Sequence, residues 1–294
     1  MKFVTIDEEL DRFKDYAIKV FNLSEGTVKQ YISRLRIFFD KVKKRPEELE
    51  VIDILNFFEW MYDIGSATST MNVTLSALRT FLDYKVYIKD IDRNVAREFK
   101  RRFRTPKKLP EVLTVEEMEK MILYPFKYYK KKKNKELRAT WESAVMTVLA
   151  TTGIRLGEFE KLKPKDVDLD KKQIKVYGKG SKERIVPIIT KWFKDVDVLE
   201  MYEFLFFDEG RKYKRSRITI WRFITRYGQE LFPGRNVTPH TFRHSFATAL
   251  IREGLDLVTV KEILGHRSIY VTEMYVHIVK QDVIQKLKES GLID

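Results

Sequence analysis

Apolar residues recur at helical spacing through the first hundred residues of the chain. In residues 7–21, five of them fall on one helical face: Leu10, Phe13, Tyr16, Ala17 and Val20. The same spacing predicts four further helices, over about 27–42, 51–64, 68–84 and 95–103. Ser24 is placed to cap the second of these helices, Pro46 breaks the pattern, and Gly65 ends the third. The pattern predicts a compact all-α domain over residues 1–104, without a catalytic group of its own.

A basic stretch, RRFRTPKKLP, follows at Arg101–Pro110. Two prolines and five cations leave it little to bury, which is typical of a linker able to lie along a phosphate backbone. We therefore predict a linker over 105–110 and a second domain over 111–294.

The pattern in the second domain alternates between helix and strand. Thr114 and Glu117 have the spacing of a capping box. Alternating apolar residues predict two strands joined by a turn at Gly178–Ser181, with Lys179 at its tip and Pro187 closing the return strand. Helices are expected over about 137–150, 198–206, 219–231, 239–253 and 258–264, with a basic loop at 127–135. The predicted fold is mainly α, with a small antiparallel β-hairpin in an α+β second domain.

Charge changes this picture. The 294 residues include 57 Lys and Arg against 43 Asp and Glu, a net charge of +14, and the isoelectric point is about 9.6. Residues 1–105 hold only 20 basic and 17 acidic side chains, so most of the excess lies in the second domain. Such an excess points to a polyanionic partner. The chain has no cysteine, no apolar run long enough to span a membrane and no signal-peptide pattern, so we expect a soluble cytoplasmic protein.

Candidate chemistry gathers between Thr238 and His277. His240 and Arg243 lie three residues apart, on one face of a helix that begins at Thr238–Pro239. The stretch holds all four histidines of the chain and two tyrosines: His240, His244, His266, His277, Tyr270 and Tyr275. No carboxylate or thiolate completes a metal shell among them. The histidines could cap and pack the helix; alternatively, an Arg–His–Tyr cluster suits the stabilisation of a phosphoryl group under attack.

Further motifs extend this cluster. Arg155, with Glu158 three residues later, lies in TGIRLGE; Lys179 lies in GKGSKERIVP; HTFRHSFAT, LGHRS and MYVH follow in order. Together they resemble the tyrosine recombinase (phage integrase-like) family, most closely its Xer-type site-specific recombinases. The resemblance covers essentially the whole chain and implies an N-terminal SAM-like core-binding domain and a catalytic domain.

The resemblance also implies a role for each matching residue. Tyr275 would be the nucleophile, forming a 3′-phosphotyrosyl link; Arg155 and Arg243 would bind the phosphate oxygens. Lys179 would protonate the leaving 5′-oxygen, His240 would assist proton transfer at the tyrosine, His266 would hydrogen-bond the phosphate, and Glu158 would support the site. Tyr270 is the rival nucleophile, but the family spacing after His266 favours Tyr275. His244 and His277 are expected to be structural or close to the phosphate. No metal, nucleotide or other cofactor is implied.

The implied partner is double-stranded DNA with a specific recombination site, with no membrane or small-molecule substrate. We expect phosphate contacts from basic residues of the first domain and linker: Lys29, Arg34, Lys43, Lys44, Arg101, Arg102, Arg104, Lys107 and Lys108. The apolar stripe of a C-terminal helix over about 279–294 must either pack on its own domain or dock on a neighbour, and the resemblance favours docking in a tetramer formed on DNA. The alternatives to dimer resolution by a Xer-type enzyme are an integrase of a virus or mobile element, a type IB topoisomerase, and a non-enzymatic DNA-binding protein.

Overall fold

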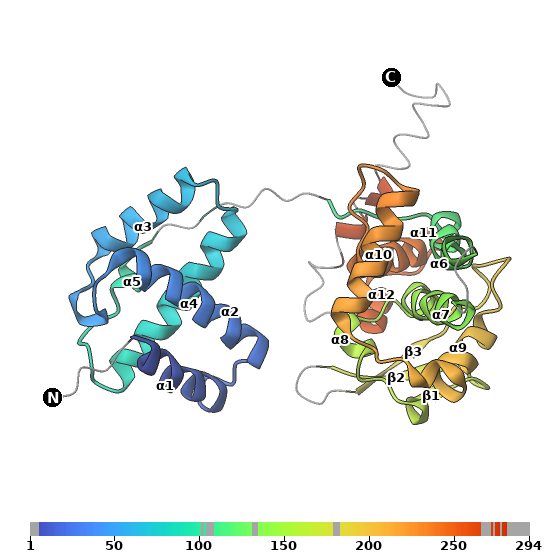
Figure 1. Cartoon of the computed structure of the whole chain (residues 1–294), viewed down its shortest axis with the longest axis horizontal. Coiled ribbons are helices and arrows are strands. Elements are labelled where there is room, and N and C mark those ends of the chain that lie inside the picture. The colour runs from blue at the N-terminus through green and yellow to red at the C-terminus, as the bar shows by residue number, and fades with distance from the viewer. Residues whose placement is uncertain are drawn as a thin grey trace, which may run out of the picture. The chain divides into compact units, whose positions relative to one another are not determined.

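The structure is a computed structural model that describes residues 6–100, 103, 109–130, 135–178, 183–265, 272, 274–276 and 278–280. It divides into two compact units, Met1–Lys107 and Lys108–Asp294 (Figure 1). Each unit has its own apolar core. The fold class expected from the sequence, mainly helical with a small antiparallel sheet, is confirmed.

The first unit is entirely helical in its described residues. It contains α1 (Ile6–Lys19), α2 (Glu25–Val42), a 3₁₀ turn η1 (Pro46–Glu48), α3 (Val51–Asp63), α4 (Thr68–Tyr87) and α5 (Val95–Glu98). Ser24 caps α2 as expected, since its Oγ accepts from the Thr27 amide at 3.2 Å. Aromatic rings fill the core, with edge contacts of Phe13 and Phe39 on Phe81.

Helix α5 is shorter than the sequence pattern predicts. It ends at Glu98, after which the backbone is extended at Phe99. Arg79 of α4 donates to the carbonyls of Ala96 and Phe99, which satisfies oxygens that further helical turns would have bonded. The rings of Phe99 and Phe103 both pack against the Phe58 ring, and this packing stabilises the extended backbone that follows α5.

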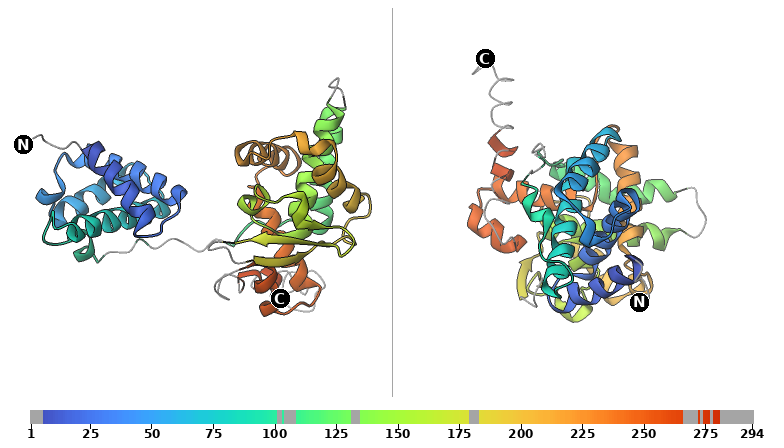
Figure 2. Two further views of the ribbon diagram at one scale, coloured as in Figure 1. Left: turned by 90° about the horizontal axis from the view of Figure 1, so that it is seen from below. Right: turned by 90° about the vertical axis from the view of Figure 1, so that its left-hand side faces the viewer.

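The second unit is a helical body with a sheet at one edge (Figure 1). Its helices are α6 (Val115–Tyr129), α7 (Glu136–Thr152), α8 (Leu156–Phe159), α9 (Val198–Phe207), α10 (Arg217–Leu231), α11 (Pro239–Arg252) and α12 (Leu257–Leu264), with 3₁₀ turns η2 (Pro164–Asp166) and η3 (Glu209–Lys212). The strands are β1 (Val167–Asp168), β2 (Gln173–Tyr177) and β3 (Glu183–Pro187). They pair antiparallel in the order β1–β2–β3, and Figure 2 shows this sheet in a second view.

The predicted hairpin is present, with Gln173 opposite Pro187 and Tyr177 opposite Glu183. Pro187 therefore ends an edge strand, where its missing amide costs no ladder bond. Two features differ from the prediction. The two-residue strand β1 was not expected, and α6 continues to Tyr129, beyond the start of the predicted loop at 127–135.

Helix α7 is the buried centre of the second unit. Thirteen of its seventeen residues are buried, and it contacts α6, α9, α10 and α11. Glu142 is fully buried in this helix, where Arg138 donates to its carboxylate at 2.7 Å and the Tyr227 hydroxyl bonds its other oxygen. A buried charge is tolerated only when it is paired in this way.

Candidate active site

Arg243 is held inside the second unit by two backbone carbonyls. Its Nη1 donates to the carbonyl of Gly153 at 2.8 Å, and its Nη2 to that of Leu264 at 2.7 Å. These two residues end α7 and α12, so α11 carries the guanidinium between the ends of two other helices. Burial, and then the charge of Arg155, lower the pKa of Arg243 to about 10, which leaves it protonated at neutral pH. A guanidinium has five N–H donors, so the two carbonyl bonds fix its plane and leave three donors for an anion.

Gly153 allows α7 and α11 to approach each other closely. It adopts a left-handed conformation at φ +59°, and a Cβ there would lie 2.4 Å from the Phe246 ring of α11. A side chain at this position would push α7 away from α11 and move the carbonyl that orients Arg243.

Arg155 follows two residues later as the N-cap residue of α8. Its Nη1 donates to Glu158 at 3.0 Å, and Arg184 of β3 bonds both oxygens of the same carboxylate at 3.0 and 2.9 Å. Burial alone would raise the pKa of the Glu158 carboxyl. The hydrogen bonds and charge of Arg184, followed by those of Arg155, outweigh burial and leave this pKa below its ordinary value. Glu158 is therefore an ionised anchor that ties α8 to β3, and the Arg155 side chain remains 41% exposed.

Tyr275 lies in the interior of the same unit. Its side chain is 1% exposed and packs with Phe246, Leu250 and Ile278. Its hydroxyl lies 3.0 Å from Nδ1 of His244. Burial raises the pKa of the Tyr275 phenol, although the charges of Arg243 and Arg155 oppose the rise. The tyrosine is thus neutral in this structure and is within the electrostatic reach of both arginines.

His240 lies one turn before His244, at the exposed start of α11. Partial desolvation of its ring, and then the charges of Arg243 and Arg155, lower its pKa. Both histidines are therefore neutral at pH 7, and the charge of Arg243 lowers the pKa of each.

Among the described residues, four predicted site side chains come together: Arg155, Glu158, Arg243 and Tyr275, with His240 at the rim. Lys179, His266, the rival Tyr270 and His277 lie outside the described residues. Two contacts were not anticipated: that of His244 with Tyr275 and that of Arg184 with Glu158. The spacing of four between His240 and His244, which places them on one helical face, was the available signal for the first.

The basic candidates of the first unit differ in their surroundings. Lys43 and Lys44 are ion-paired, with Asp40 and Asp53 respectively. Lys29 is exposed and Arg34 is half-exposed, and no ion pair of either is found within residues 6–100. The other five candidates lie outside the described residues: Arg101, Arg102, Arg104, Lys107 and Lys108.

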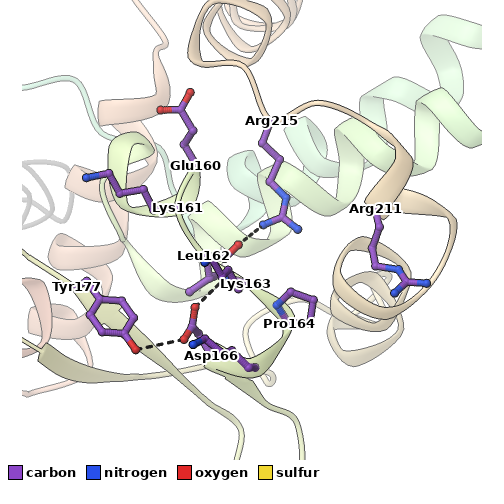
Figure 3. A pocket seen from close by; sticks show the side chains of 10 residues that line it. Glu160, Lys161, Leu162, Lys163, Pro164, Asp166, Tyr177, Arg211 and Arg215 are labelled. Carbon is purple, nitrogen blue, oxygen red and sulfur yellow. Dashed lines mark hydrogen bonds between the residues drawn. The ribbon is translucent and has the colours of Figure 1, made fainter.

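A separate open pocket of about 900 Å³ lies between η2, β2 and η3 (Figure 3). Its lining includes five cations, Lys161, Lys163, Lys165, Arg211 and Arg215, against two carboxylates, Glu160 and Asp166. None of the predicted site residues that the structure describes lines it. Arg215 is held there by a bond to the Leu162 carbonyl, and Tyr177 bonds Asp166 (Figure 3).

The described part of the chain lacks two kinds of feature, a metal-binding group and a membrane-spanning helix. No group of three or more His, Cys, Asp or Glu side chains there is arranged to hold a metal ion. No helix within those ranges is long and apolar enough to cross a membrane.

Residues 111–282 match the phage integrase family, and residues 10–91 match the N-terminal SAM-like domain of phage integrases. The chain belongs to the phage integrase family, whose members are tyrosine recombinases. It is 30% identical to tyrosine recombinase XerC of Thermodesulfovibrio yellowstonii, over 91% of this chain and 90% of the relative. It is 31% identical to tyrosine recombinase XerD of Chlorobaculum tepidum, over 92% and 91%.

The fold has counterparts among solved structures. One is a lambda integrase tetramer bound to a Holliday junction, with a TM-score of 0.71 and 17% identity, over 92% of this chain and 77% of that one. At this identity the likeness concerns the fold alone.

Proposed function

We propose that this protein is a Xer-type site-specific recombinase that cuts and rejoins duplex DNA through a covalent link to Tyr275. The observation that carries the proposal is the convergence of Arg155, Arg243 and the Tyr275 phenol in one site of a tyrosine recombinase fold. The net charge of +14 supports a polyanionic substrate.

In strand cleavage, the Tyr275 oxygen attacks the scissile phosphorus and the bond from phosphorus to the 5′-oxygen breaks. The product is a 3′-phosphotyrosyl link and a free 5′-hydroxyl. Arg155 and the three unused donors of Arg243 bind the non-bridging oxygens, where negative charge grows in the transition state. Lys179 supplies the proton to the leaving oxygen, and His266 donates a further bond to the phosphate.

Rejoining reverses these steps on a 5′-hydroxyl, which can belong to another strand. The phosphotyrosyl ester conserves the energy of the broken bond, so exchange proceeds without a nucleotide. Fixed guanidinium groups supply the positive charge that metal ions provide in many phosphoryl transfers.

The substrate is a specific site in double-stranded DNA, and the working assembly is a tetramer. The relative of similar fold that forms a tetramer on a Holliday junction supports this arrangement. The predicted docking helix over 279–294 lies outside the described residues beyond Lys280. We assign the protein to the resolution of chromosome or plasmid dimers, which would place it with the nucleoid in the cytoplasm.

The test is covalent trapping on a nicked DNA site from which the cleaved fragment diffuses away. Wild-type protein should accumulate a protein–DNA adduct in the presence of EDTA. Tyr275→Phe should bind the DNA and form no adduct, while the matched Tyr270→Phe should retain adduct formation. An adduct with Tyr275→Phe, or a strict need for Mg²⁺ in cleavage, would contradict the assignment.

A further inference from the structure

His244 makes a direct contact with the oxygen that performs the attack. Its Nδ1 lies 3.0 Å from the Tyr275 hydroxyl, and the two rings are tilted by 49° with centroids 5.7 Å apart. His244 is half-buried in the middle of α11, where helix packing fixes its backbone. Tyr275 is almost fully buried, so bulk water has little access to its hydroxyl.

The protonation states of His244 and Tyr275 determine which side chain donates in this hydrogen bond. Burial lowers the pKa of His244 to about 4, and the charges of His240 and Arg243 add to the effect. The phenol of Tyr275 keeps its proton because burial raises its pKa. When Nε2 carries the imidazole proton, Nδ1 is an acceptor, and the phenol donates to it.

We propose that His244 is a catalytic residue, which accepts the phenolic proton of Tyr275 during strand cleavage and returns it during rejoining. This inference rests on the proposed function. In cleavage, the tyrosine O–H bond breaks as the O–P bond forms, and the proton moves to Nδ1 of His244. The P–O5′ bond breaks, and the 5′-oxygen takes a separate proton from the acid on the leaving-group side. Rejoining returns both protons to their starting atoms.

Burial explains why the proton stays on the tyrosine until DNA binds, since it disfavours both the imidazolium of His244 and the phenolate of Tyr275. The charge of Arg243 further disfavours an imidazolium at His244, whereas the charges of Arg243 and Arg155 act on the Tyr275 phenol in the sense opposite to burial. Glu158 and Arg184 neutralise each other in their ion pair. The local field is therefore positive and disfavours an imidazolium.

A DNA phosphate offsets part of that positive field. A negative charge within a few ångströms favours the protonated imidazole and strengthens His244 as a base. The substrate thus activates the base that activates the nucleophile, and the free enzyme holds Tyr275 in an unreactive state. Base catalysis at a single proton transfer contributes on the order of a hundredfold or more to the rate.

The test compares His244→Asn with His240→Asn. An asparagine at 244 carries an amide oxygen near the position of Nδ1, so it can accept the tyrosine hydrogen bond but cannot take the proton. The rate of adduct formation is measured in a single turnover on nicked DNA, with DNA affinity measured in parallel. We expect His244→Asn to bind DNA as the wild type does and to form the adduct about a hundredfold more slowly.

Rescue separates a base from a merely structural residue. A difluorotyrosine installed at position 275 ionises more easily, so it should restore adduct formation to His244→Asn, as should a higher pH. His240→Asn should gain less from either change. His244→Gln, tested in the same way, replaces the asparagine variant if that variant does not fold.

Two results would overturn the inference: wild-type cleavage by His244→Asn, or a defect that neither difluorotyrosine nor higher pH relieves. Failure of the wild-type protein to form any adduct would count against the proposed function instead.

Discussion

His240 and His244 lie one helical turn apart and both lie in the field of Arg243, yet their surroundings differ. His240 is exposed at the start of α11, and His244 is half-buried one turn further along the helix. Burial gives His244 the lower pKa, about 4, against the ordinary value of 6.5. The two histidines thus occupy different environments in the same site, and the half-buried His244 is the one that contacts Tyr275.

The depressed pKa of His244 predicts a dependence of stability on pH. Below pH 6.5 the unfolded chain takes up a proton that the folded protein refuses until about pH 4, so the native state loses stability as the pH falls through this interval. The contribution is fully present above pH 6.5, and its loss amounts to roughly 2 kcal/mol at pH 5.

Urea unfolding at pH 7.5 and pH 5 measures this effect. His244→Asn should lose less stability than the wild type between the two values, because asparagine does not titrate. Other groups contribute equally to both proteins and cancel in the difference. Equal losses would show that His244 titrates normally in the folded state.

At the residue scale, the sequence predicted which side chains would carry the chemistry but not how they meet. The arginines could be predicted because Arg155 and Arg243 stand in distinctive motifs. The contact between His244 and Tyr275 joins residues 31 positions apart, and the placement of His240 and His244 on one helical face was a local signal for it that did not name the partner. The Arg184–Glu158 pair likewise joins residues 26 positions apart through the packing of α8 on β3.

At the scale of elements, the junction of α7 with α11 depends on Gly153. Its left-handed backbone and its proximity to Phe246 act together. Gly234 offers a comparison, since it has φ +83° and no atom lies within 4 Å of the point that a Cβ would occupy. The two glycines thus share the backbone requirement and differ in the space around them.

Gly153→Ala should therefore destabilise the protein more than Gly234→Ala. Both substitutions incur left-handed strain of about 1–2 kcal/mol, and only the first also forces Phe246 to move. Thermal unfolding and adduct formation measure the two consequences. We expect Gly153→Ala to lose activity as well, since the Gly153 carbonyl orients Arg243; equal effects of the two substitutions would argue against the close contact.

Most elements followed from local pattern, and the exceptions have non-local causes. The start of α2 was predictable because Ser24 caps it, and the hairpin because its strands alternate. The early end of α5 could not be predicted from local pattern, since it depends on hydrogen bonds from Arg79 and on stacking of Phe99 against Phe58. Strand β1 is only two residues long and exists because β2 pairs with it.

Two cations of the α2 segment, Lys29 and Lys43, should contribute differently to DNA affinity. Lys29→Ala should weaken binding and reduce the slope of log affinity against log salt by about 0.9 if it meets one phosphate. Lys43→Ala should have a smaller effect, because its ammonium must first leave Asp40. Salt titrations of the two variants on one DNA site measure this; a larger effect at Lys43 would contradict it.

At the scale of the whole molecule, the two units have separate cores and are predicted to have different tasks. The predicted catalytic side chains that the structure describes all belong to the second unit, while the first holds four of the basic residues predicted to contact phosphate. We therefore expect truncation to separate substrate affinity from chemistry.

Deletion of residues 1–105 should lower DNA affinity and its salt dependence while the second unit retains adduct formation at high protein concentration. Each phosphate that the truncated protein no longer neutralises should reduce the salt slope by about 0.9. Fluorescence anisotropy on a specific and a random duplex measures both affinity and selectivity. Full affinity for the specific site in the truncated protein would show that the first unit does not bind DNA.

The burial of α7 has a consequence for measurement in solution. Thirteen of its seventeen residues are shielded by the helices packed around them, so its amide hydrogens should exchange with deuterium only when the whole second unit opens. Their exchange rate then reports the global stability of that unit at equilibrium, without denaturant. Bound DNA should slow this exchange by a factor of one plus the ratio of free DNA concentration to its dissociation constant, so a single buried helix can serve as the gauge of substrate occupancy.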